Sequence, residues 1–298
     1  MLQLLSSALV LGSIYLLFSM GLSLSWGVLN ILNLAHGSIF MFGAFSAYLI
    51  TREVSAEIPL VVLVLFGALV GGALSVLLQL LVYQPLQRHA ADKHSAELGV
   101  LIASIGVGLI PVTIALNLAT DEVVNLPSAV VQTQVHTVGS VRITSLQIAI
   151  VVISLATALA LSLFVAKTRT GRALRTIAAD PVTADIMGIP VARLSALTMF
   201  ISGALAGTAG LLLAANANAI EAHMGDGLLL KAFAAVVLGG VGSIPGAVVG
   251  AFALALGESF AVEYFGGDAK DFVAFGLIIV VLLLRPQGIF ARTEGQRA

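Results

Sequence analysis

A group of polar side chains interrupts the first long apolar stretch of the sequence. Asn30, Asn33 and His36 lie in SWGVLNILNLAHG, and no charged side chain precedes Arg52. If this stretch enters a membrane, such groups must be buried in protein or line a cavity. They could contact a substrate, but hydrogen bonds between helices, worth about 0.6 kcal/mol each, would explain them equally well. Both interpretations stay open at this stage.

A second candidate part of a substrate path is the glycine-rich segment GGVGSIPG at 239–246. Its glycines and proline break any continuous helix. It has neither the lysine nor the preceding strand that a phosphate-binding loop needs. It could be a re-entrant turn whose freed backbone groups line a substrate path, or a close contact between helices. The candidate path residues here are Gly239, Gly240, Gly242, Ser243, Pro245 and Gly246.

Several kinds of chemistry are excluded by what the sequence lacks. It contains no GxxxxGK[ST], HExxH or GxSxG motif, and no cysteine. We also see no pair of carboxylates within an apolar segment, where a proton relay would need one. The net charge of −1 does not suggest binding to nucleic acid. We therefore expect neither a catalytic residue nor a metal site nor a cofactor of the chain's own.

The composition determines which elements must hold these residues. Of 298 residues, 59% are hydrophobic and only 10% are charged, and the mean hydropathy is +1.09. Soluble domains carry about 25% charged residues, so the chain is predicted to be a single all-α, polytopic transmembrane helix bundle spanning 1–298. After two segments within 1–51, the predicted spans are 58–87, 98–120, 143–166, 194–220 and 272–284.

Charged loops predict the topology. Basic residues concentrate in 88–94 and in 167–193, which places both on the cytoplasmic side. Arg285, Arg292 and Arg297 place the C-terminal tail, 286–298, on the same side. Alternating residues from Val131 to Thr137, a Gly139-Ser140 turn and the run 141–144 indicate a small extracytoplasmic β-hairpin.

The later loops impose a further condition on the topology. Lys231 lies in the predicted outer loop 221–231, and Glu258 lies in the acidic, also outer, loop 257–271. Residues 232–257 must then enter and leave at one face, as two half-helices that meet at the glycine-rich segment. The N-terminus lies outside if 2–24 cross completely, and inside if the break at 25–36 is re-entrant.

The cytoplasmic loop contains a polar segment, 171–188, built for docking. Asp180 is a good N-cap, Pro181 suits the first helical position and Gly188 follows the last turn, so 181–187 should form a short helix. So short a helix is not stable alone. The predicted docking face comprises Leu174, Ile177, Ala178, Ile186 and Met187. A helix lying on the membrane surface, with its arginines on lipid phosphate, is the alternative.

These segments resemble a known family. NLAHG, the run from GRALRTIAADPVTADIMG to GTAG, KAFAAVVLGGVGSIPGAVVGA and LRPQGIF, in this order and spacing, are similar to the LivH-type membrane subunit of branched-chain amino acid ABC importers. The likeness covers nearly the whole chain. It implies a non-catalytic permease in a bacterial-type inner membrane. Its ATPase-coupling loop would use Arg172, Arg175, Ala178, Ala179, Asp180 and Gly188.

The resemblance also implies partners. These are two cytoplasmic ABC ATPase subunits that bind the ATP, a LivM-type permease subunit or a second copy of this chain, and an extracytoplasmic substrate-binding protein. The substrate would be a branched-chain or related apolar amino acid. Related permeases transport urea, amides or aromatic acids, which is one alternative. An ion-coupled secondary transporter is another, although it should carry ionisable groups at mid-membrane.

Overall fold

The computed structural model describes residues 1–54, 58–119, 122–127, 134–138, 141–267, 269–284 and 288–289, and helices dominate them. Among these described residues, six helical segments are long and apolar enough to cross a membrane. The first helices are α1 (Leu2–Leu29), α2 (His36–Glu53), α3 (Leu60–Leu78), the π-helical turn η1 (Gln79–Tyr83), α4 (Gln84–His89) and α5 (Lys93–Leu118). They are followed by α6 (Ser145–Lys167), α7 (Arg169–Ala179), α8 (Pro181–Ile186), α9 (Val191–Ala217), α10 (Met224–Gly239), α11 (Ile244–Phe265) and α12 (Ala269–Leu284).

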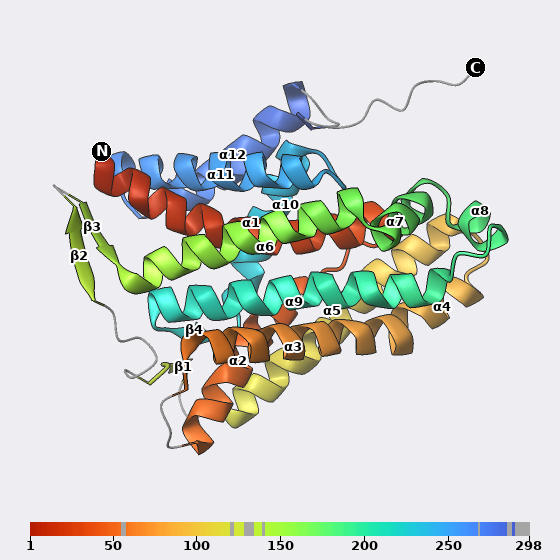
Figure 1. Cartoon of the computed structure of the whole chain (residues 1–298), viewed down its shortest axis with the longest axis horizontal. Helices are drawn as coiled ribbons and strands as arrows, with labels where there is room; N and C mark the ends of the chain where they lie inside the picture. Colours follow the sequence, from red (N-terminus) through yellow and green to blue (C-terminus); the bar gives the residue numbers. More distant parts are fainter. Residues whose placement is uncertain are drawn as a thin grey trace.

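The long helices run roughly along one axis and give the bundle two ends (Figure 1). The hairpin end carries the N-terminus and the strands β2 (Val135–Val138) and β3 (Val141–Thr144), whereas α4, α7 and α8 gather at the opposite, bridge end. The two basic loops that sequence placed on one side of the membrane therefore lie at one end of the molecule.

Most predicted spans have a helical counterpart. The run predicted at 58–87 is a continuous helical segment from Leu60 to His89, in which η1 joins α3 to α4. The runs at 98–120, 143–166 and 194–220 correspond to α5, α6 and α9. The last predicted span is α12, whose 16 residues make about 24 Å of helix.

The first predicted span is complete, and a break follows it. Helix α1 has 28 residues and ends at Asn30, whose left-handed φ of 54° stops the helix. Its N-terminus lies at the hairpin end, where the Gln3 side chain exchanges two hydrogen bonds with the Arg142 backbone, at 3.1 and 2.9 Å. Helix α1 runs from the hairpin end toward the bridge end (Figure 1) and is long and apolar enough to cross a membrane completely, as the first of the two alternatives for the N-terminus requires.

The sequence predicts two half-helices that meet at the glycine-rich segment, and this prediction is wrong for the second of the two helices. Helices α10 and α11 do pack as an antiparallel pair joined at 240–243. However, α11 has 22 residues and is one of the six potential spans, while only α10, with 16, is short. The 240–243 turn abuts Gly27, near the end of α1, and so lies toward the bridge end.

Two pairs of short strands tie loops together. β2 pairs with β3 in antiparallel register, Val135 opposite Thr144 and Val138 opposite Val141. The predicted strand residues 131 and 133 and the Gly139-Ser140 turn lie outside the described residues. A second ladder, β1 (Val123–Val124) with β4 (Ile220–Glu221), was not predicted. It joins the loop after α5 to the loop before α10.

Glycines set the closest helix contacts in the core. At Gly207 on α9, an added Cβ would collide with the backbone of Gly67 on α3, and Gly43 on α2 approaches Gly207 just as closely. Without side chains at these positions, three helix backbones can touch. The run from Gly203 to Gly210 is therefore a packing face, as its small residues predict.

Candidate coupling surface and internal polar groups

The polar bridge forms two short helices, each begun by a side-chain cap. The Thr168 hydroxyl accepts a hydrogen bond from Gly171 N at 2.9 Å at the start of α7. The Asp180 carboxylate accepts one from Val182 N at 3.0 Å at the start of α8. At the end of α8, Gly188 has a φ of +79°. The caps predicted from sequence thus bound α8 at both ends.

The predicted docking face divides into two parts. On α7, Leu174 and Ile177 are 1% and 2% exposed because this helix packs against α6 and α1. On α8, Ile186 and Met187 are 81% and 69% exposed, together with Val182. The α7 part therefore docks on the chain itself, and the α8 part leaves an apolar patch of Val182, Ile186 and Met187, the α8 patch, open at the bridge end.

The predicted coupling residues Arg172, Arg175, Ala178 and Ala179 lie on α7. The Arg175 guanidinium contacts the carbonyls of Val165 and, at 3.4 Å, of Ala166. These lie in the last turn of α6, where a cation is favoured by the helix dipole. Arg175 thereby fixes α7 on α6. Arg172 and Ala179 are exposed, and Ala178 is half-buried.

Two of the predicted path residues lie together inside the bundle. His36 is fully buried, its Nε2 donates to Phe18 O at 3.2 Å, and its ring stacks on Phe18. The Asn33 carbonyl oxygen accepts hydrogen bonds from Tyr83 Oη at 2.7 Å and Ala35 N at 3.1 Å. Tyr83 ends η1, and π-helical turns recur at functional sites.

This interior contains polar atoms with no hydrogen-bond partner among the described residues. They include Asn33 Nδ2 and His36 Nδ1. Since Nε2 of His36 donates, its Nδ1 is an acceptor in the neutral ring. Unpaired buried polar atoms are rare and require an explanation. Elsewhere in the described bundle, buried oxygens without a hydrogen-bond partner include Ser19 Oγ, Ser23 Oγ, Ser75 Oγ, Gln79 Oε1, Ser154 Oγ and Ser259 Oγ.

The remaining path candidates lie elsewhere. Asn30 is exposed at the end of α1. The glycine turn is a packed joint: Gly239 meets the backbone of Gly246, Gly242 meets Gly27, and Ser243 caps α11 by accepting from Gly246 N at 3.1 Å. The described part of the C-terminal segment returns to this joint, where Ile289 N donates to Leu238 O at 2.9 Å. The structure thus brings Asn33 and His36 together, and separates both from the turn.

One internal ion pair was not predicted from the sequence. Lys231 Nζ lies 3.0 Å from Glu258 Oε1, and Tyr15 Oη donates to Glu258 Oε2 at 2.7 Å. The two charged side chains are 12% and 4% exposed. The prediction that Lys231 and Glu258 lie in outer loops is therefore wrong. The pair joins α10 to α11, and Tyr15 adds α1.

Long apolar helices, close glycine contacts and a few enclosed polar groups define a multi-pass α-helical membrane protein. The chain belongs to the branched-chain amino acid transport system/permease component family, whose model matches residues 4–282. It is therefore a membrane component of a transport system.

Individual relatives match almost end to end. The chain is 33% identical to the high-affinity branched-chain amino acid transport system permease protein BraD of Pseudomonas aeruginosa. It is also 33% identical to LivH of Escherichia coli, and each alignment covers 99% of this chain and 97% of the relative. The fold is similar to that of PsaBC from Streptococcus pneumoniae in complex with Fab, with a TM-score of 0.50, 13% identity and coverage of 96% and 92%.

Proposed function

We propose that this chain is the permease subunit of an ABC importer that moves branched-chain or related apolar amino acids into the cell. The full-length likeness to permeases named for such transport carries this proposal. ATP would be bound and hydrolysed by two separate cytoplasmic subunits. A LivM-type subunit or a second copy of this chain would complete the path, and an extracytoplasmic binding protein would deliver the substrate.

The bridge end is the proposed cytoplasmic end. It gathers α4, which carries Arg88, with α7 and α8 of the basic segment 167–193, and excess positive charge favours the cytoplasmic side. The hairpin and the N-terminus would then be extracytoplasmic.

The α8 patch is the proposed contact with an ATPase. A helix of six residues, closed at both ends and presenting Val182, Ile186 and Met187 to solvent, has the size and chemistry to insert into a groove of a partner. Asp180 and Gly188 would hold its shape, and Ala178 and Ala179 would form the adjoining surface. Arg172, exposed beside it, would meet the partner's surface.

The proposed substrate path passes Asn33 and His36. Asn33 Nδ2 offers a donor and His36 Nδ1 an acceptor. These are the groups that a carboxylate and an ammonium of a zwitterion require. Asn30 and the turn residues Gly239, Gly240, Gly242, Ser243, Pro245 and Gly246 would border the cytoplasmic exit of the same path.

Two measurements test the assignment. The solubilised chain, expressed with its neighbouring subunits, should retain an ATPase, and uptake should stop when ATP is depleted while the ion gradient is kept. Persistent uptake without ATP would instead indicate an ion-coupled carrier. Ile186→Glu should abolish ATPase retention, whereas Phe265→Glu, at a side chain 84% exposed on the opposite end, should not.

A second pair of variants tests the shape of α8. Gly188→Pro is incompatible with a φ of +79°, and Asp180→Arg removes the cap. Both proteins should still insert into the membrane but lose ATP-driven uptake. Normal uptake by both would show that α8 is not the coupling element.

A further inference from the structure

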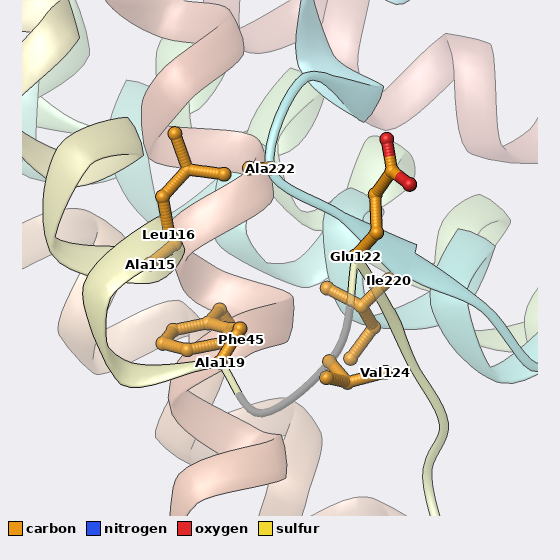
Figure 2. A pocket seen from close by; sticks show the side chains of 8 residues that line it. All are labelled: Phe45, Ala115, Leu116, Ala119, Glu122, Val124, Ile220 and Ala222. Carbon is orange, nitrogen blue, oxygen red and sulfur yellow. The ribbon is translucent and has the colours of Figure 1, made fainter.

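A cavity of about 280 Å³ lies where α5 ends, beside α2 and the β1–β4 ladder (Figure 2). It is close to the lower end of the range for small-molecule pockets, about 300 Å³. Because its walls come from segments near residues 45, 115–119, 122–124 and 220–222, the fold brings together parts that are distant in sequence.

The lining is apolar with one exception. Figure 2 shows Glu122 across the cavity from Leu116, above Phe45 and Val124. Glu122 is exposed and carries the only charge among the described residues that line the cavity. In the described part of the chain, no cation lies within ion-pair distance of its carboxylate.

The end of α5 adds a second negative element at the same place. Helix α5 ends at Leu118, its C-cap Ala119 lines the cavity, and Ala115 and Leu116 belong to its last turn. The last carbonyls of a helix lack partners within it and give its C-terminus a negative partial charge. Glu122 and this helix end therefore favour a cation at the rim of an apolar cavity.

The cavity is also connected to a helix of the core. Ile220 and Ala222 line it, Ile220 belongs to β4, and α10 starts two residues after Ala222. A ligand in the cavity thus touches the segment that leads directly into the helix carrying Lys231. The cavity lies beside the middle of α2 and the C-terminal end of α5. The strands β1 and β4, which also line it, lie at the other end of the bundle from α8 (Figure 1).

We propose that this cavity is an outer binding site for a small molecule with an apolar body and a protonated amine, which is an apolar amino acid if the proposed transport function holds. Its ammonium group pairs with Glu122, its side chain packs against Phe45, Leu116 and Val124, and its carboxylate faces the opening. The site would be the first that the substrate occupies on this chain, before Asn33 and His36.

Direct binding to the purified, detergent-solubilised transport complex tests this without requiring transport. Titrations with leucine, with 3-methylbutylamine and with 4-methylpentanoate separate the contributions of ammonium and carboxylate. Leucine and the amine should bind, and the acid lacking an amine should bind at least about tenfold more weakly. Equal binding of the acid, or no binding of leucine and the amine, would overturn the proposal.

Three variants refine the test. Glu122→Gln should weaken binding of leucine and the amine by about tenfold or more, whereas Glu263→Gln, at another exposed carboxylate, should leave both unchanged. Ala222→Phe should fill the cavity and block both ligands with Glu122 intact. Wild-type affinity in Glu122→Gln would refute the site. ATP-dependent uptake and ATPase retention, measured separately, report on the transport function itself.

Discussion

The internal pair Lys231–Glu258 gives the sharpest prediction of stability. Its nitrogen and oxygen are 3.0 Å apart and its side chains are 12% and 4% exposed, so removing one partner breaks an ion pair that is largely shielded from water. That loss costs about 3 to 5 kcal/mol in buried pairs. Lys231→Met and Glu258→Gln should each lower the free energy of unfolding by this amount. Tyr15→Phe should cost less, about 1.5 to 3 kcal/mol, because it removes one hydrogen bond to a charged acceptor.

Equilibrium unfolding in mixed micelles measures these changes. The double variant Lys231→Met/Glu258→Gln leaves no uncompensated charge and should recover much of the loss. The pair His223–Asp226 provides a matched control: its atoms are also 3.0 Å apart, but its side chains are 64% and 65% exposed. Asp226→Asn should therefore cost at most about 1 kcal/mol. If the single variants at Lys231 and Glu258 cost no more than this control, the reasoning about burial is wrong.

Three further predictions concern packing, capping and hydrogen bonding. Gly207→Ala should cost about 1 to 3 kcal/mol, because its Cβ meets the α3 backbone, whereas Gly106→Ala, with nothing within 4 Å, should be neutral or stabilising; equal melting temperatures would contradict the packing role. Thr144→Ala removes the capping box of α6 and should cost about 1 kcal/mol; unchanged amide exchange in the first turn would argue against it. Tyr83→Phe removes one donor to Asn33 and should cost about 1 kcal/mol, and an unfolding free energy equal to that of the wild type would refute this.

The spans could be predicted because about 20 charge-free residues are needed to cross a membrane, and few other arrangements produce such runs. The boundaries of α8 could also be predicted, since Asp180, Pro181 and Gly188 act through local backbone geometry alone. The division of the docking face into a buried part on α7 and an exposed part on α8 could not be predicted, because burial of Leu174 depends on how α7 packs on α1 and α6.

The internal charges escaped prediction for a related reason. Assigning loops from charge treats Lys231 and Glu258 one at a time and assumes that each of them faces water. The pair depends on how α10 packs on α11: the contacts of Gly239 with Gly246 and of Ala235 with Gly250, seen only in the structure, set an antiparallel register. This register puts Lys231 opposite Leu254, one turn from Glu258. The β1–β4 ladder has only two residues in each strand, which is too short to produce a pattern in the sequence.

The candidate path residues lie at different depths in the bundle, because closeness to a helix break in the sequence does not determine how deeply a residue is buried. Asn30 and Asn33 are three residues apart, yet Asn30 is exposed while Asn33 is fully buried. The left-handed turn at Asn30 ends α1, and the chain then folds inward. The hydrogen bond of Asn33 to Tyr83, 50 residues away, could be found only in three dimensions.

Helix α1 has the length and the contacts of a lever within this fold. It contacts α7 near one end and the β3 loop at the other, and between them α6, α9, α10 and α11. Its 28 residues make a rod of about 42 Å, so a tilt of about 5° around its midpoint would move each end by roughly 2 Å in opposite directions. A small push at the bridge end would thereby be converted, without any intermediate element, into an opposite displacement at the far end of the molecule.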